Sequence, residues 1–499
     1  MVNILKLLIK SIDIMSYLWH KISHVLAIKI FNFFFKKFIK RRLLWHRYCF
    51  ENSCQSLHFY EKFLSIIPKK IPQSLKQCHT DFTRKRKLPF PKLITFILSI
   101  VVNGKSQGVD TKAGIFFTVA RRCNLWNDAS PIHRSALTKA RKKVSWSIFQ
   151  DILNHAVKLA YEIWPKKPEY LWHAMSIYAI DGSVYTLPAT PKLREEFDPD
   201  SGLGNSGKGH YPQCLVSTVY DVFRRLPIDR SICKKYGSER EEAKTLIPSI
   251  PSGGVILFDR GYPGYEFIKE IINTYLGYFI FRCSATSSFP AVISFLSSGK
   301  KESVIWIKPT QSYRRDKGTK LWREAKPIKL RVIKLVAPDG TVSVLLTNLF
   351  EARNFIQKDI IDLYFRRWEI ETHYRNEKIV LEVEKFHGKT PNSIRQELFA
   401  IMIMSVISRT IMVLSVSESQ QQMKGEPQFK NAMMTLAHDA AVLTPSDPEK
   451  AIKIFEEIIK QIARVKYYPP KKKRISQPRL TKRKINKWCI ARQIKLLTA

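Results

Sequence analysis

Short apolar runs that end in Gly, Pro or Asp constrain the fold of this chain more than any other feature. Three of them are Ile177–Ile180, Cys214–Tyr220 and Val255–Phe258. Runs of four or more apolar residues bounded by turn-forming residues are typical of buried strands. A charged stretch at 238–250 separates the second run from the third and predicts a helix capped by Ser238. Strands that alternate with helices predict an α/β domain.

Helical patterns flank this domain on both sides. Residues 1–168 carry apolar residues at intervals of three and four, as amphipathic helices do. After the domain, we expect a long helix from Phe355 to about Glu382, further helix through Leu414, and a helix from Pro448 to about Val465. Between them, polar turns separate four strand candidates, which are Tyr278–Arg282, Val304–Ile307, Leu330–Val336 and Val342–Leu346.

The charge balance narrows the classes of partner. The chain has 84 Lys and Arg against 42 Asp and Glu, a net charge of +42, and no acidic residue follows Lys460. Such an excess indicates a polyanionic partner, either nucleic acid or an acidic membrane surface. The apolar runs of the first fifty residues are interrupted by charges and are too short for a membrane span, so they predict a basic helical hairpin.

Cysteine usage argues for a reducing compartment. The 8 cysteines form no C-x-x-C pair, which disfavours both a disulfide scaffold and a structural zinc site. We therefore expect reduced thiols and a cytoplasmic location.

Two aspartates follow apolar runs and are candidates for a metal site. Asp181 comes directly after Ile177–Ile180, and Asp259 after Val255–Phe258. Ligands of open α/β sheets gather at the carboxyl ends of strands, and paired carboxylates suit Mg²⁺ or Mn²⁺. Each also has a plain structural interpretation, an Asp-Gly turn for Asp181 and an ion pair with Arg260 for Asp259.

A stripe of polar residues on the long expected helix strengthens the functional interpretation. At about 100° per residue, four side chains fall within an arc of about 60°, with Arg375 just beside it. They are Tyr364, Arg367, Glu371 and Lys378. A solvated helix face normally mixes charges through i, i+4 pairs. Here a single carboxylate, Glu371, lies among cations and a phenol, which instead indicates that the neighbouring groups bind phosphates.

With these residues the chain resembles a known family, the DDE-class transposases of bacterial insertion sequences. One branch of that family carries the signature Y-x(2)-R-x(3)-E-x(6)-K, which the four stripe residues match without a gap. The family's D-G-[ST] motif matches Asp181–Ser183, and its D-R-G-[FY] motif matches Asp259–Tyr262. Tyr211–Gln213 also matches a Y-P-Q motif, and the resemblance covers roughly residues 80–490.

The resemblance implies a ribonuclease-H-like catalytic core in which Asp181, Asp259 and Glu371 hold two Mg²⁺ ions, or Mn²⁺ in their place. Asp181 is expected to bridge the two ions. Such ions would activate water or a DNA 3′-hydroxyl and stabilise the leaving oxygen. Members of this branch carry a β-rich insertion between the second Asp and the Glu, which the strand candidates at 276–349 fit.

The resemblance also assigns DNA contacts. Tyr364, Arg367 and Lys378 would hold phosphates beside the scissile bond, and the position of Arg375 adds it to this group. Similar enzymes free the element through a DNA hairpin and stack an unpaired base on a Trp of the insertion. Trp306 and Trp322 are the candidates here, with packing inside the insertion as the equal alternative.

A basic stretch near the end of the helical region is a candidate surface for recognition of the transposon ends. It spans 134–143, and its cations are Arg134, Lys139, Arg141, Lys142 and Lys143. The alternative is a solvated helix face, because no groove-reading motif is recognisable in this stretch. The basic cluster at 471–484 is typical of a tail that contacts the DNA backbone.

The predicted organisation has five parts. They are a helical DNA-binding region (1–168), the first part of the catalytic domain (169–275), the β-rich insertion (276–349), the second part of the catalytic domain with the Glu-bearing helix (350–445), and a C-terminal helix with a basic tail (446–499).

The predicted function is that of a DNA transposase that cleaves transposon ends and transfers strands to target DNA. Its partners would be double-stranded DNA, namely terminal inverted repeats and target, and a second copy of the chain, in a bacterial cytoplasm at the nucleoid and without a membrane. A metal-dependent nuclease that cuts without joining and a transposase-derived DNA-binding protein without catalysis remain alternatives. A membrane-surface protein is disfavoured by the distributed basic charge.

Overall fold

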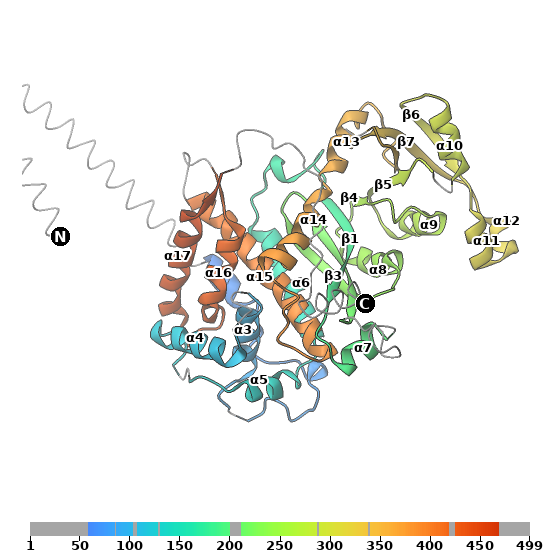
Figure 1. Ribbon diagram of the computed structural model, residues 1–499. Helices are drawn as coiled ribbons and strands as arrows, with labels where there is room; N and C mark the ends of the chain where they lie inside the picture. Colours follow the sequence, from blue (N-terminus) through green and yellow to red (C-terminus); the bar gives the residue numbers. More distant parts are fainter. Residues whose placement is uncertain are drawn as a thin grey trace, which may run out of the picture.

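The computed structural model describes residues 58–84, 86–102, 107–127, 130–199, 211–286, 289–337, 340–418 and 425–468. An 8-stranded sheet runs through these residues, with a group of helices beside one half of it (Figure 1). The strand order is β3-β2-β1-β4-β5-β8-β7-β6. The hairpin expected in the first fifty residues and the basic cluster at 471–484 lie outside the described residues.

The first half of the sheet contains the strands expected from the sequence, together with one strand, Leu226–Lys234, that the sequence patterns did not predict. Its members are β1 (Ile177–Thr186), β2 (Gln213–Asp221), β3 (Leu226–Lys234), β4 (Val255–Phe258) and β5 (Tyr278–Ser284). β2 is antiparallel to both β1 and β3, whereas β4 and β5 continue the sheet parallel to β1. All four residues of β4 are buried, as expected for a parallel strand covered on both faces.

The distal half of the sheet also contains the expected strands. They are β6 (Glu302–Ile307), β7 (Ile328–Val336) and β8 (Val342–Thr347), and β8 joins them to the rest by pairing antiparallel with β5. Three helices that the strand patterns did not indicate lie among them, namely α10 (Pro290–Ser297), α11 (Gln311–Lys317) and α12 (Thr319–Glu324). α11 and α12 protrude at the far end of the molecule (Figure 1).

Three further helices accompany the first five strands. They are α7 (Pro191–Phe197), α8 (Glu239–Leu246) and α9 (Tyr265–Thr274). α8 packs against β1, β2 and β3. The expected cap of α8 is confirmed, because the Ser238 side chain accepts a hydrogen bond from the Glu241 backbone N–H.

Helices from both ends of the chain pack together. The N-terminal ones are α3 (Phe90–Ile100), α4 (Val109–Arg122), α5 (Arg134–Arg141) and α6 (Ser147–Ile163), and the C-terminal ones are α15 (Pro391–Glu418), α16 (Phe429–His438) and α17 (Pro448–Arg464). α15 is central, since it contacts α3, α6, α16, α17 and strand β3. Long-range hydrogen bonds join the two groups, including one from the Trp126 indole to the Thr444 carbonyl at 2.8 Å.

α15 is also long and apolar enough, by length and composition, to cross a membrane. Its qualifying segment is Pro391–Val416, with a mean hydropathy of 2.1. In this structure 83% of its apolar window is buried among the neighbouring helices and β3. The hydropathy is therefore that of a helix inside a protein core.

The long helix expected from Phe355 to Glu382 is interrupted, which corrects that prediction. The structure has α13 (Gln357–Phe365), α14 (Trp368–Arg375) and a π-helical turn at Asn376–Val380. Between α13 and α14 the backbone N–H groups of Arg366, Arg367 and Glu369 each bond to the carbonyl three residues earlier. The helix ends because Glu382 adopts a left-handed conformation with φ at 48°.

Candidate active site

The two candidate aspartates lie side by side, although Asp181 is not at the end of its strand as expected. β1 continues past Asp181 to Thr186 because β2 pairs with it along its length, whereas β4 stops at Phe258. In the parallel register Ile177 pairs with Val255 and Ala179 with Leu257. The same offset brings Asp181 level with Asp259, so the two side chains leave the same face of the sheet.

The third candidate carboxylate reaches the same point from α14, and Arg367 lies among all three. The Arg367 Nη2 atom is 2.8 Å from Glu371 Oε1 and 3.8 Å from Asp259 Oδ1, and its Nη1 atom is 3.7 Å from Asp181 Oδ2. The Arg367 side chain is only 3% exposed, and its Nε and Nη1 atoms have no hydrogen-bond partner. Three separate segments of the chain therefore place carboxylates around one buried guanidinium.

The other stripe residues differ in their surroundings. The Tyr364 hydroxyl donates a hydrogen bond to Asp259 Oδ1 at 3.3 Å. Lys378 Nζ donates to the Ser183 hydroxyl at 2.6 Å and to the Val184 carbonyl at 2.7 Å, so it reaches β1 beside Asp181. Arg375 is exposed. The interruption of the helix therefore still leaves Tyr364, Arg367, Glu371 and Lys378 facing the two strands.

The electrostatics of the site follow from partial burial. Burial raises the pKa of Asp181 to about 7, and the positive charge of Arg367 opposes this rise. The side chains of Asp181, Asp259 and Glu371 keep 18%, 33% and 28% exposure, so solutes can reach them. Oxygen ligands of this kind suit Mg²⁺ and Mn²⁺.

The present arrangement is not that of a closed metal site. Among the described residues, no three His, Cys, Asp or Glu side chains are positioned to hold a metal ion together. The Arg367 guanidinium occupies the space between the carboxylates. The donor chemistry of the three carboxylates fits a divalent cation.

A buried ionic network that the sequence patterns did not indicate anchors the end of the Glu-bearing helix. Glu377, in the π-helical turn, accepts two hydrogen bonds from Arg230 Nη2 at 2.9 and 3.0 Å, and one from the Tyr185 hydroxyl. His373 Nε2 lies 3.3 Å from the same carboxylate. Arg230 Nη1 also donates to the Leu398 carbonyl at 2.9 Å. The network therefore joins β1, β3, α15 and the helix that carries Glu371.

Tyr374 makes a second connection between this helix and the sheet. Its hydroxyl donates to the backbone carbonyl of Asp181 at 2.7 Å and lies 3.2 Å from that of Val216. A buried phenol bonded to the backbone of the Asp-bearing strand fixes the distance between Glu371 and Asp181.

The two candidate tryptophans have different environments. Trp306 lies on the edge strand β6 and is 56% exposed. Trp322, on α12, donates its indole N–H to the Pro309 carbonyl at 3.1 Å, and the Arg314 guanidinium lies over its ring at 5.4 Å. Packing within the insertion therefore accounts for Trp322, whereas Trp306 presents its ring to solvent.

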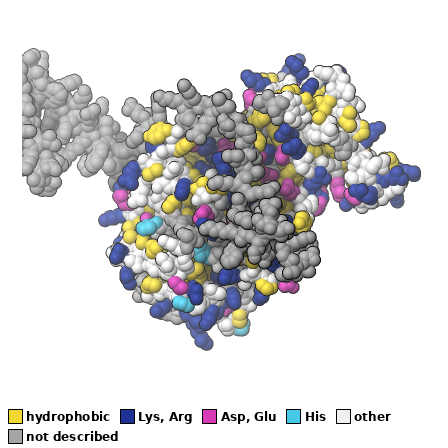
Figure 2. All heavy atoms as spheres, in the orientation of Figure 1, with side chains coloured by type: hydrophobic (Ala, Val, Ile, Leu, Met, Phe, Trp, Pro, Cys, Tyr) yellow, Lys and Arg dark blue, Asp and Glu magenta, His cyan; other side chains and the backbone are white. Residues whose placement is uncertain are grey.

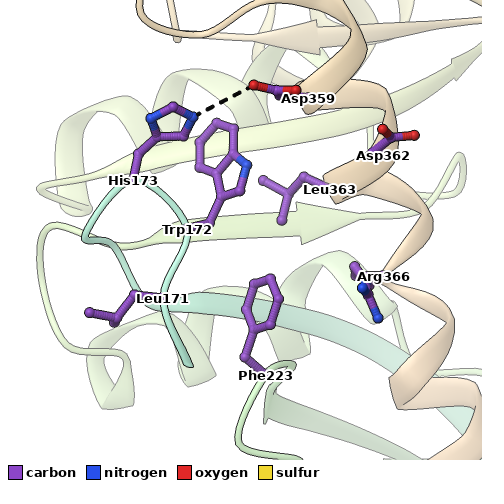
Figure 3. Close-up of a pocket in the computed structure, with 8 residues that line it drawn as sticks. All are labelled: Leu171, Trp172, His173, Phe223, Asp359, Asp362, Leu363 and Arg366. Carbon is purple, nitrogen blue, oxygen red and sulfur yellow. Dashed lines mark ion pairs between the residues drawn. The ribbon is translucent and has the colours of Figure 1, made fainter. Parts of the chain in front are cut away.

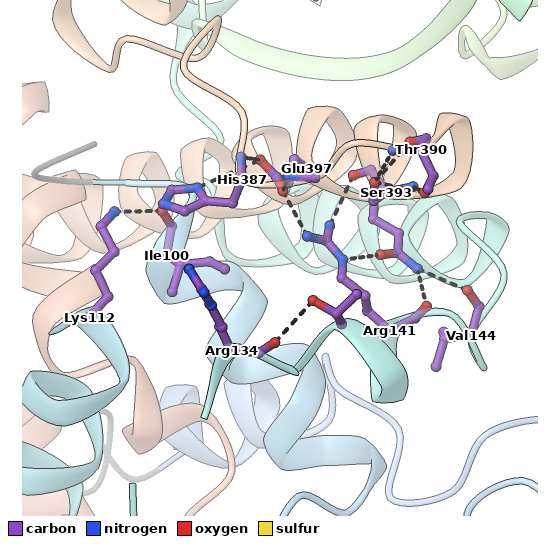
Figure 4. Close-up of polar contacts among 12 residues, drawn as sticks. Ile100, Lys112, Arg134, Arg141, Val144, His387, Thr390, Ser393 and Glu397 are labelled. Atoms are coloured by element: carbon purple, nitrogen blue, oxygen red, sulfur yellow. Dashed lines mark hydrogen bonds and ion pairs between the residues drawn. The ribbon is translucent and has the colours of Figure 1, made fainter. Parts of the chain in front are cut away.

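One residue of the expected DNA surface at 134–143 is wrongly assigned. Arg141 is only 5% exposed and pairs with Glu397 of α15 at 2.9 Å, while also donating to Gln396 and to the Ser393 carbonyl (Figure 4). These contacts hold α5 against α15, so Arg141 supports the packing of the two helices and is not part of the predicted DNA surface. Lys139 and Lys142 remain exposed.

A separate cavity of 440 Å³ lies beside α13 (Figure 3). Trp172 and Phe223 form apolar walls, and His173 pairs with Asp359 at 3.9 Å. Asp359 and a second aspartate, Asp362, oppose a phosphate there. None of the candidate catalytic residues lines this cavity, so we treat it as distinct from the candidate active site.

Basic side chains are widely distributed over the visible face of the molecule. Figure 2 shows Lys and Arg over the helical part and over the distal strands, and they do not form a single patch.

Comparison with known proteins identifies the family. Residues 172–407 match the family described as transposase DDE domain, and this span includes Asp181, Asp259 and Glu371. The chain is similar to the transposase InsG for insertion sequence element IS4 of Escherichia coli (strain K12), with 22% identity over 347 residues that cover 68% of this chain and 73% of that protein. These matches support the assignment of the chain as a DDE-class insertion-sequence transposase.

Two further proteins are similar to this chain. The putative transposase y4zB of Sinorhizobium fredii (strain NBRC 101917 / NGR234) is 29% identical over 196 residues, which cover 39% of this chain and 52% of that protein. A solved structure, the cryo-EM synaptic complex of piggyBac transposase with hairpin DNA, aligns over 84% of this chain and 87% of that chain, with 11% identity and a TM-score of 0.41.

Proposed function

We propose that this protein is a metal-dependent DNA transposase that cleaves the ends of its insertion sequence and joins them to target DNA. The observation that carries the proposal is the meeting of Asp181, Asp259 and Glu371 around Arg367. These residues come from β1, the end of β4 and α14, and they are the positions that the family motifs select. The family supports the same function.

A ribonuclease-H-like core is the fold that we propose for the catalytic part. The order β3-β2-β1-β4-β5, with three antiparallel strands followed by two that are parallel to β1, supports this assignment. The sequence predicted an insertion that begins at residue 276, but β5 (Tyr278–Ser284) pairs parallel with β4, so the insertion that we propose begins after β5 and contains β6 to β8. The helical segment before β1 and the helices after α14 would contact DNA and support the core.

We infer that Asp181, Asp259 and Glu371 would hold two divalent cations, Mg²⁺ or Mn²⁺. Divalent cations bound there would lower the pKa of the attacking water or 3′-hydroxyl and stabilise the leaving oxygen. The protein's own contribution is positioning: Glu377 and Tyr374 fix the helix, and the register of β1 with β4 fixes the two aspartates.

The cations around the triad would hold the DNA strand. Arg367 has two buried nitrogen atoms without hydrogen-bond partners, which a phosphate oxygen would satisfy when the guanidinium turns from the carboxylates. Arg375, Lys378 and Tyr364 would contact neighbouring phosphates. Trp306, exposed on β6, would stack an unpaired base at the transposon end, whereas the contacts of Trp322 with Pro309 and Arg314 favour its packing role.

The partners that we propose are the terminal inverted repeats, target DNA and a second copy of the chain that holds the other end. The net charge of +42 supports binding to DNA phosphates in the cytoplasm. The exposed Lys139 and Lys142 would be among the phosphate contacts of the helical region.

The test is cleavage of a labelled DNA fragment that carries the end of the element encoding this protein, in Mg²⁺. Wild type should cut at the end, and Glu371→Gln should bind the fragment without cutting it. Glu369→Gln is the matched control, because Glu369 lies on the same helix and pairs with Arg225 at 3.5 Å. Equal cutting by wild type and Glu371→Gln would remove Glu371 from the mechanism.

Precleaved ends separate the two alternatives. A transposase joins their 3′ ends to a target plasmid, whereas a nuclease without strand transfer leaves them unjoined. Specific binding of the end without any cutting by wild type would instead identify a DNA-binding protein without catalysis.

A further inference from the structure

A fourth carboxylate lies beside the proposed catalytic triad, on an element that carries none of the family motifs. Glu239 occupies the first turn of α8, which packs on β1. A methyl group on Gly182 would lie 2.7 Å from both Cδ and Oε1 of Glu239. The residue after Asp181 therefore lacks a side chain because the Glu239 carboxylate fills that space.

Glu239 acts electrostatically on both aspartates. Burial is the main cause that raises its pKa, and the charge of Asp259 raises it further. Burial is the largest cause that raises the pKa of Asp181, and the positive charge of Arg367 opposes it. The negative charge of Glu239 is the next largest cause and raises the pKa of Asp181 further. The carboxylate is therefore half-buried and within electrostatic reach of two triad members.

A buried hydroxyl lies against the same carboxylate. Tyr262, the last residue of the motif that begins at Asp259, is 1% exposed, and its hydroxyl interacts with the Glu239 side chain. Burial raises the pKa of Tyr262, and the negative charges of Glu239 and Asp181 raise it further, so the phenol lies close to this cluster. Tyr262 and Glu239 therefore form one polar group beside Asp181.

We propose that Glu239 is a positioning residue of the catalytic centre, which with the Tyr262 hydroxyl binds the water shell of the divalent cation held by Asp181 and Asp259. The proposal rests on the metal-dependent function proposed above. Outer-shell partners orient the direct ligands, and their loss typically lowers metal affinity about 10- to 100-fold.

Favourable placement at a helix start is the competing explanation for an acidic residue at this position. α8 carries Glu241 and Glu242 in the same first turn, and either one serves that role. Glu241 pairs with Lys244 at 2.9 Å and its side chain is 66% exposed, so it is the matched control. Helix-start stabilisation predicts that the two residues behave alike, whereas our proposal predicts that they differ.

The experiment measures Mn²⁺ binding to the full chain without DNA, from the electron paramagnetic resonance signal of free Mn²⁺. Glu239→Gln should weaken Mn²⁺ binding about tenfold. Glu241→Gln should leave the dissociation constant within about twofold of wild type, because it lies outside the cation's shell. Gly182→Ala should also weaken binding, because its methyl group displaces the Glu239 carboxylate. The double variant Gly182→Ala with Glu239→Gln should have a dissociation constant for Mn²⁺ no larger than the larger of the two single-variant values.

The outcomes separate this proposal from the proposed function. If Asp181→Asn loses Mn²⁺ but Glu239→Gln binds it as wild type does, Glu239 has no role at the cation and the metal-dependent function stands. If Glu239→Gln and Glu241→Gln weaken binding equally, the effect belongs to the helix start and the inference is wrong. Wild type that binds no Mn²⁺ at millimolar concentration would overturn both.

Discussion

Glu377→Gln is the substitution that we expect to destabilise this protein most among changes to single charges. The side chains of Arg230 and Glu377 are 0% and 1% exposed, so solvent does not screen the pair. Removing one partner of a buried ion pair costs about 3–5 kcal/mol, because the remaining charge is left uncompensated. The amide introduced by this substitution would still accept a hydrogen bond, so we expect the free energy of unfolding to fall by about 3 kcal/mol.

The assay is urea denaturation followed by circular dichroism, with the midpoint compared between variants. Glu457→Gln is the control, because Glu457 pairs with Lys460 at a similar 2.9 Å but the two side chains are 61% and 65% exposed. An exposed pair contributes about 0.2–1 kcal/mol at most. The double variant Arg230→Met with Glu377→Met should be less destabilised than Glu377→Gln, since it leaves no buried charge unpaired.

The pH dependence supplies a second check with a defined sign. Although burial opposes it, the positive charge of Arg230 holds the pKa of Glu377 below its usual range. A lowered pKa in the folded state contributes stability above the ordinary Glu value of about 4.3, which is lost as the pH falls through the folded pKa. The difference between wild type and Glu377→Gln should therefore shrink below about pH 4. Equal midpoints for Glu377→Gln and Glu457→Gln at pH 7 would refute the assignment of a buried, uncompensated charge.

Three other changes have defined outcomes. The first change concerns the raised pKa of Asp181, about 7, which makes ionisation of this carboxyl unfavourable in the folded state when EDTA removes metal ions. The free energy of unfolding should therefore fall as the pH rises from about 4 through 7. Asp181→Asn should accordingly have a higher melting temperature than wild type at pH 8 and the same melting temperature at pH 4, and a difference that does not change with pH would contradict this explanation. Arg141→Met should lower the melting temperature by leaving Glu397 unpaired, while Lys142→Ala should leave it unchanged and weaken DNA binding in a filter assay; the reverse pattern would restore Arg141 to the DNA surface. Trp306→Ala should leave the melting temperature unchanged and weaken binding of an end with an unpaired base more than binding of intact duplex, and equal effects on both would exclude base stacking.

The strands, and the three carboxylates that meet around Arg367, could be found in the sequence because their signals are local. Each apolar run between turn-forming residues needs only burial on both faces to become a strand, and all of the expected strands formed. The same reliance on local signals placed the end of β1 too early, at Ile180 instead of Thr186. Asp181 and Gly182 read as a turn in isolation, but β2 supplies hydrogen-bond partners that carry β1 on to Thr186.

The charged residues that support the site could not be predicted, because their partners are distant in sequence. Arg230 and Glu377 are 147 residues apart, and Arg141 and Glu397 are 256 residues apart. A charge in a basic or acidic run looks solvated until the fold places an opposite charge against it. Glu239 belongs to the same class, because its relation to Gly182 exists only once α8 packs on β1.

Arg367 shows how the same residue can serve the fold and the chemistry in turn. Without a cation, its guanidinium offsets the repulsion among Asp181, Asp259 and Glu371, which would otherwise destabilise their half-buried cluster. In the mechanism that we propose, a divalent cation at the triad would take over that role and free the guanidinium for a phosphate. The two buried nitrogen atoms that now lack hydrogen-bond partners would gain them in that step. Cation binding and DNA binding would then be coupled through one side chain, and Arg367→Gln should raise Mn²⁺ affinity while weakening DNA binding.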